Sequence, residues 1–124
     1  MPMKIGTDIV QISRIEASIE KFGDKFIDRF LTPQERETLS QKPESLAGYW
    51  AAKEAVAKAL GCGIGAELGF HDIRITKDTR GTPHCALSPS AQERFDLQSA
   101  SLSLSHDGGF AIAVVALTQV LSDD

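Results

Sequence analysis

The chain has 124 residues, with 42% hydrophobic and 24% charged side chains and a formal net charge of −4. We expect one globular, cytoplasmic domain spanning residues 1–124. A membrane partner is not expected, because no apolar run approaches the roughly 20 residues that span a bilayer. A nucleic-acid partner is not expected either, because that function needs a basic surface. Cys62 and Cys85 match neither a zinc site nor a disulfide framework.

The first part of the chain is predicted to hold a strand that leads into a helix. Residues 3–10 form the predicted strand, with Gly6 inside it. Ser13 and Glu16 are three residues apart, as in a capping box that opens a helix. Gly23 is expected to end that helix, since glycine is the common residue just past a helix.

Further helices are predicted up to the middle of the chain. The apolar residues in 26–30 indicate another helical turn or two, and Thr32 followed by Pro33 marks a helix start. Residues 46–60 consist mostly of alanine and larger apolar side chains, the pattern of a long helix buried on most sides. That helix is expected to end at Gly61.

The second half is predicted to be mostly strands. A hairpin is expected from strands near residues 73–75 and 84–87, and a short helix from residues 88–97. Residues 99–105 alternate strictly, and a turn at residues 107–109 leads into a last strand. Helices followed by antiparallel strands predict an α+β fold, with an antiparallel sheet and a long central helix.

The long helix carries an acid in apolar surroundings. Its charged residues are Lys53, Glu54 and Lys58. A buried carboxylate needs a partner, which can be Lys58 one turn on, a metal ion, or both. Asp8, at the end of the first strand, supplies a second carboxylate, and two carboxylates from separate elements suit Mg²⁺. The plain alternatives are a helix-surface ion pair and a strand-end turn residue.

Two further segments are candidates for ligand contact. Gly61, Gly63 and Gly65 form a flexible loop after the long helix, where Gly61 alone explains a helix cap. The extra glycines would allow the backbone to approach a phosphate. Serines at every odd position of residues 99–105 put hydroxyl groups on one strand face, and His106 follows them. A solvated edge strand is the alternative.

Three segments together resemble a known family. Residues 6–10 (Gly-Thr-Asp-Ile-Val), residues 50–59 (Trp-Ala-Ala-Lys-Glu-Ala-Val-Ala-Lys-Ala) and residues 103–107 (Ser-Leu-Ser-His-Asp) resemble the holo-[acyl-carrier-protein] synthases. These are the small bacterial branch of the 4'-phosphopantetheinyl transferases. The resemblance covers essentially the whole chain in order and length. It implies Mg²⁺-dependent transfer of 4'-phosphopantetheine from coenzyme A to a serine of apo acyl carrier protein, with release of 3',5'-ADP, in fatty acid biosynthesis.

The resemblance also implies roles for particular residues. Asp8 and Glu54 correspond to the Mg²⁺ ligands, and Lys58 to the lysine that meets the pyrophosphate. The proton of the carrier serine would pass to Glu54 or to a metal-bound water, and the sequence leaves both open. The implied coenzyme A pocket comprises Lys58, Gly61, Gly63, Gly65, Pro83, Ser105 and His106.

Two positions depart from the family pattern. Tyr49 stands where many relatives have arginine, and Thr82 stands where a lysine is frequent. The contacts to the 3'-phosphate and the adenine therefore stay open.

The resemblance implies a homotrimer with a site at each subunit interface and an acidic carrier protein as partner. Arg14, Lys21 and Lys25 lie on one predicted helical stripe, a basic surface on an acidic protein, which favours docking of that carrier. A solvated helix face is the alternative. Two rival functions are a Mg²⁺-dependent nucleotide pyrophosphate hydrolase and a non-catalytic module that binds acyl carrier protein.

Overall fold

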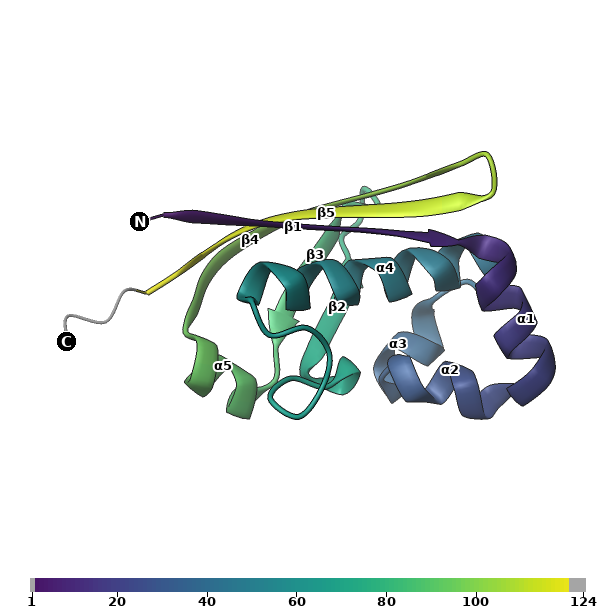
Figure 1. Ribbon diagram of the computed structural model, residues 1–124, viewed down its shortest axis with the longest axis horizontal. Coiled ribbons are helices and arrows are strands. Elements are labelled where there is room, and N and C mark those ends of the chain that lie inside the picture. Colours follow the sequence, from purple (N-terminus) through teal and green to yellow (C-terminus); the bar gives the residue numbers. More distant parts are fainter. Residues whose placement is uncertain (1, 121–124) are drawn as a thin grey trace.

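The computed structural model describes residues 2–120, which form the predicted α+β fold in layers: a sheet, a long helix beneath it, and smaller elements below (Figure 1). In chain order the elements are β1 (Met3–Gln11), α1 (Ile12–Phe22), α2 (Asp24–Phe30), α3 (Pro33–Thr38), α4 (Pro43–Leu60), a 3-10 turn (Phe70–Asp72), β2 (Ile73–Lys77), β3 (Pro83–Leu87), α5 (Pro89–Phe95), β4 (Leu97–Asp107) and β5 (Phe110–Gln119). No helix among the described residues is long and apolar enough to cross a membrane.

The main sheet has the order β1-β5-β4, with antiparallel neighbours, and β2 and β3 form a separate antiparallel hairpin. The alternate residues of β5 from Ala111 to Leu117 are buried against α4. Below α4, the helices α1–α3 lie at one end and the hairpin with α5 lies at the other (Figure 1). The long helix is therefore covered on most sides, as its composition predicts.

Gly6 lets β1 rest directly on the backbone of α4. A Cβ atom at Gly6 would lie 2.0 Å from the carbonyl oxygen of Ala55 and 2.9 Å from the Cβ of Ala59. Only glycine facing alanine permits this approach. Because residues two apart on a strand share a face, Asp8 is brought to the same helix.

Lys53 is a core residue that ties α4 to α3 and β2. Its ammonium is fully buried and lies 2.7 Å from Oε1 of Glu35, and it also donates to the carbonyl of Phe70 at 3.1 Å. Glu35 accepts further bonds from the backbone N–H groups of Thr32 at 2.7 Å and Ile75 at 2.8 Å. Burial lowers the pKa of Lys53, while Glu35 opposes that change. Both charged groups have hydrogen-bond partners, so the Lys53–Glu35 pair fixes the positions of α3, α4 and β2 relative to one another.

One predicted helix start is wrong and two other helix ends are confirmed. The cap of α1 is Gln11, whose side chain makes no cap bond, so Ser13 and Glu16 form no capping box. The reason is that the N–H of Ile12 bonds to Gly109 at 2.9 Å, which carries the sheet ladder into the helix start. The helix start predicted at Thr32 and Pro33 is confirmed, and Thr32 and Glu35 form a capping box there. The predicted end of α4 at Gly61 is confirmed too, in the left-handed region with φ of 87°.

Candidate active site

Asp8, Glu54 and Lys58 lie together on one flank of α4. The Lys58 ammonium is 2.8 Å from Oδ1 of Asp8 and 3.3 Å from the carbonyl oxygen of Thr7. The Asp8 side chain is only 14% exposed, whereas that of Lys58 is 53% exposed. β1 and α4 thus position the three groups that the sequence singles out.

The Asp8 carboxylate and burial both act on Glu54. Burial raises the pKa of Glu54, the charge of Asp8 raises it further, and Lys58 opposes both. One ammonium therefore offsets two neighbouring acids only in part. Carboxylate oxygens are the hard ligands that Mg²⁺ prefers.

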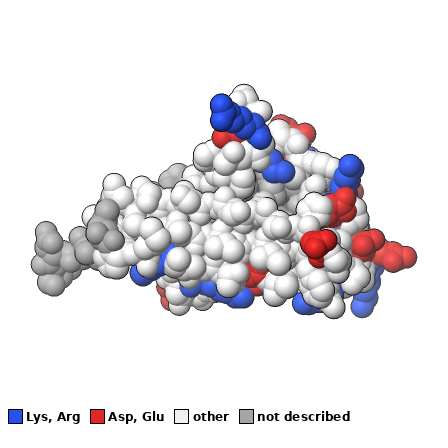
Figure 2. Space-filling model, turned by 90° about the horizontal axis from the view of Figure 1, so that it is seen from above, with Lys and Arg blue, Asp and Glu red and all other residues white. Residues whose placement is uncertain are grey.

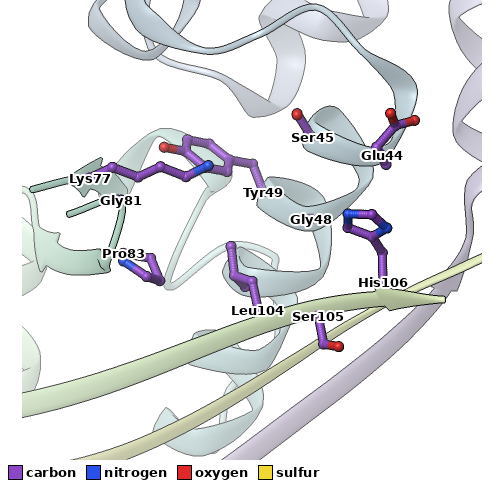
Figure 3. A pocket seen from close by; sticks show the side chains of 10 residues that line it. All are labelled: Glu44, Ser45, Gly48, Tyr49, Lys77, Gly81, Pro83, Leu104, Ser105 and His106. Carbon is purple, nitrogen blue, oxygen red and sulfur yellow. The ribbon is translucent and has the colours of Figure 1, made fainter. Parts of the chain in front are cut away.

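A second group of predicted residues lines a pocket on the other side of α4 (Figure 3). The pocket lies between the first half of α4, the β2–β3 hairpin and β4, and its volume is about 210 Å³. Pro83 and His106 both line it, together with Tyr49 and Lys77. Ser105 also borders the pocket, but its side chain points away from it (Figure 3), as expected for the residue next to His106 on a strand.

The glycine loop does not join this pocket within one chain. Gly61 caps the end of α4, whereas Gly48 lines the pocket near its start. At 1.5 Å per residue the 13 steps between them span about 20 Å. Gly61, Gly63 and Gly65 are absent from the pocket lining among the described residues. They lie instead just past the end of the helix that carries Glu54.

The predicted site residues therefore form two separate groups. At 100° per residue, Glu54 and Lys58 are about 140° and 180° around α4 from Tyr49. Asp8, Glu54 and Lys58 lie on one flank of α4, and the pocket with His106 lies on the other. A single chain holds both halves but does not bring them together.

Lys77 and Gly6 lie at these sites but were not among the predicted site residues. Lys77 shares one face of β2 with Ile73 and Ile75, both buried. The sequence contains a signal for Lys77, because a charged residue stands where the alternation would place a third apolar one. Gly6 was visible only as a glycine inside a strand, which indicates a close backbone approach without naming its partner.

The basic residues of the predicted stripe lie on two helices. Arg14 and Lys21 are exposed on α1, and Lys25 is exposed on α2. Gly23, with φ of 61°, separates the helices and takes Lys25 out of the phase of the other two. Lys25 instead borders an apolar hollow beside Phe22, which is 55% exposed.

Comparisons with known proteins identify the family of the chain. Residues 4–115 match the family model of the 4'-phosphopantetheinyl transferase superfamily. Over 115 residues the chain is 59% identical to the holo-[acyl-carrier-protein] synthase of Sulfurovum sp. (strain NBC37-1), covering 93% of this chain and 96% of that protein. The chain belongs to the holo-[acyl-carrier-protein] synthases.

Solved holo-[acyl-carrier-protein] synthases have the same fold. The Helicobacter pylori enzyme, crystallised in complex with coenzyme A, superposes with a TM-score of 0.88 at 49% identity over 92% of this chain and 99% of that one. The Neisseria meningitidis enzyme gives 0.85 at 38% identity over 94% and 98%. The predicted family, the transferase class and the fold are thereby confirmed.

Proposed function

We propose that this synthase transfers 4'-phosphopantetheine from coenzyme A to a serine of apo acyl carrier protein with Mg²⁺ and releases 3',5'-ADP. The observation that carries the proposal is the group of Asp8, Glu54 and Lys58. In the reaction, the serine oxygen bonds to the pantetheine-side phosphorus while the pyrophosphate P–O bond breaks, and the hydroxyl proton leaves to a base. The setting would be cytoplasmic fatty acid biosynthesis, with residues 1–124 as one transferase domain.

The cluster of Asp8, Glu54 and Lys58 fits Mg²⁺. The charge of Asp8 helps to raise the pKa of Glu54, and Lys58, at 2.8 Å from Asp8, opposes that rise. A bound Mg²⁺ would neutralise charge on the pyrophosphate. Asp8 and Glu54 would hold the ion. Lys58 is half exposed, so its ammonium could turn towards the pyrophosphate. It would then hold the pyrophosphate in line with the carrier serine.

A homotrimer with shared sites accounts for the two separate halves. The pocket of about 210 Å³ is smaller than the roughly 300–1,000 Å³ of typical ligand sites. Pro83 and His106 of one subunit would lie beside the Asp8, Glu54 and Lys58 cluster and the glycine loop of the next, and together they would form one site. Gly61, Gly63 and Gly65 would then lie near the nucleotide, and Ser105 would contribute through its backbone.

The outer face of the main sheet supports assembly from copies of this chain. Figure 2 shows this broad face with few charged side chains, which gather at its margins. Its exposed residues include large apolar ones on β1 and β5, namely Met3, Ile5, Ile9, Ile112 and Val114. An uncovered apolar face of this kind is typical of an interface.

The carrier protein would dock on α1 and α2. Arg14, Lys21 and Lys25 supply positive charge, and the exposed Phe22 with its neighbouring hollow supplies an apolar contact. An acidic partner would be attracted by the charges and held by the aromatic side chain. None of these residues lines the pocket that contains His106 in the part of the chain that the structure describes.

The test is the mass of apo carrier protein after incubation with coenzyme A, Mg²⁺ and this enzyme. We expect a gain of one phosphopantetheine and release of 3',5'-ADP only when the carrier is present, since a hydrolase would release the nucleotide without it. A carrier with serine replaced by alanine is the control. Glu54→Gln and Asp8→Asn should retain the fold and lose most activity, as should the wild type with chelator. Binding of the carrier without any mass change would indicate a non-catalytic module.

A further inference from the structure

The first two helices carry acids and bases in close succession, and the fold separates some of them. Glu16 and Glu20 of α1 line a hollow between α1, α2 and the start of α4. Lys25 and Arg29 of α2 line a different one, the apolar hollow beside Phe22, here called the α2 hollow. The two hollows share no lining residue. The acids of α1 are therefore kept out of the lining of the α2 hollow.

Two acids of α2 stay close to the bases of that helix. Asp24 precedes Lys25 directly in sequence, and Asp28 precedes Arg29. The side chains of Asp24 and Asp28 are 83% and 64% exposed, and their spacing of four residues puts them on the same side of the helix. Exposed charges act together within about 8 Å in physiological salt. Without a partner, the two acids would offset the two bases for any protein that approaches the α2 hollow.

Arg36 of α3 is the partner of both acids. Its Nη2 atom lies 3.1 Å from Oδ1 of Asp24, and its Nη1 atom lies 2.8 Å from Oδ1 of Asp28. One planar guanidinium thus donates to two carboxylates at once, which the single ammonium of a lysine does less well. The Arg36 side chain is only 25% exposed, so its charge is directed to the acids. Lys25 and Arg29 form no ion pair among the described residues, and their charges stay available.

We infer that Arg36 determines the affinity for an acidic carrier protein without being a docking residue itself, because it neutralises Asp24 and Asp28 beside the α2 hollow. This inference rests on the proposed function, in which the carrier docks on α1 and α2. The helix α2 has two acids and two bases, so its own net charge is zero. With Arg36 paired to the acids, the group becomes positive, and Lys25 and Arg29 can attract a negative partner.

The test is titration of fluorescently labelled apo acyl carrier protein with the full chain at low and at high ionic strength. Arg36→Met should weaken carrier binding about two- to fivefold at low salt, the worth of one exposed charge interaction. The difference should fade at high salt, because exposed charges are screened. Adding Asp24→Asn and Asp28→Asn to Arg36→Met should restore the wild-type affinity or exceed it, since the uncovered charges are then gone. Arg36→Lys should retain most of the affinity, because it keeps the charge.

Arg94→Met is the matched control. It removes the same charge from α5, which lies at the other end of the molecule from α1–α3 (Figure 1). The Arg94 guanidinium donates to the backbone carbonyl of Glu67 and pairs with no acid among the described residues. Carrier affinity and its salt dependence should therefore be those of the wild type.

Several results would overturn the role of Arg36. One is an unchanged carrier affinity in Arg36→Met, and another is an equal loss in Arg94→Met. A loss that persists at high salt, or that the two asparagine changes do not reverse, would mean that Arg36 only holds α2 in place.

The carrier mass assay, run in parallel, separates this inference from the proposed function. If the wild type modifies the carrier and Arg36→Met binds it equally well, the inference fails and the transferase function stands. If binding follows the expected pattern but the carrier mass does not change, the transferase function fails and the role of Arg36 stands. A wild type that does not bind the carrier overturns the docking proposal and the inference together.

Discussion

Replacing Gly6 by alanine should lower the stability of the protein and damage the proposed metal site. The added Cβ would lie 2.0 Å from the Ala55 carbonyl oxygen, where an ordinary contact begins at 3.4 Å. β1 must therefore move away from α4 by about 1.4 Å, the difference between these values. Overpacking of this kind costs typically about 1–3 kcal/mol. We expect about 3 kcal/mol, because the obstacle is backbone and no rotamer change can relieve it.

The same displacement should separate Asp8 from Glu54. Urea unfolding at fixed protein concentration would give the stability, and titration with Mn²⁺, followed by water-proton relaxation, would give the metal affinity. We expect both to fall together in Gly6→Ala.

Gly48→Ala is the matched control for stability, since its Cβ would meet only Cδ1 of Leu104 at 3.8 Å. It should be neutral or more stable by up to about 1 kcal/mol, the helix preference of alanine over glycine. Adding Ala59→Gly to Gly6→Ala removes the contact with the Ala59 Cβ at 2.9 Å but leaves those with the Ala55 carbonyl oxygen at 2.0 Å and the Ala59 nitrogen at 2.9 Å, so rescue should be minor. Wild-type stability and metal affinity in Gly6→Ala would refute this account of the contact between β1 and α4.

Other predictions concern charged groups. Lys53→Met should lower the free energy of unfolding by about 3–5 kcal/mol, because it leaves the Glu35 carboxylate buried without its cation; the double variant with Glu35→Leu should cost less than the two single changes added together, as urea unfolding would show. Mg²⁺ affinity should fall as the pH falls through the raised pKa of Glu54, because the protonated acid is a poor ligand. Asp8→Asn should lower that pKa in a metal-free NMR titration. Arg14→Glu should raise the carrier KM at constant kcat, and less so in high salt.

Each of these has a contrary result. Strictly additive costs at Lys53 and Glu35 would mean that the two side chains do not act as a pair. An unchanged Glu54 pKa in Asp8→Asn would mean that the two acids are too far apart to share an ion. An unchanged carrier KM and salt dependence in Arg14→Glu would make the basic surface a solvated face.

Much of the site could be predicted from local sequence. The acid in an alanine-rich helix required a partner, and the structure places Asp8 and Lys58 beside it. The helix end at Gly61 and the helix start at Thr32 depend on a few neighbouring residues, so the sequence was sufficient to predict them.

The remainder depended on contacts between distant segments. Lys53 is next to Glu54 in sequence and is a charged residue of the same helix. Its partner is nevertheless Glu35, 18 residues away, and this pair belongs to the core. Ser13 had the right neighbours for a cap, but a bond from Ile12 to Gly109 determined where α1 begins. The separation of the pocket from the carboxylates follows from rotation about α4, which a list of motifs does not contain.

The pairing of β1 with β5 also sets an order of events during synthesis. β1 finds its hydrogen-bonding partner about 100 residues later in the chain, and ribosomes add about 5–20 residues per second. For several seconds the emerging chain has α4 available to fold, with Glu54 and Lys58 on it, while the strand that carries Asp8 lacks its neighbour. Closing so long a loop is slow compared with forming a helix. A nascent or truncated chain without residues 110–119 therefore lacks the strand that pairs along the whole length of β1, and only the contacts with α4 can position Asp8 until the last strand has been made.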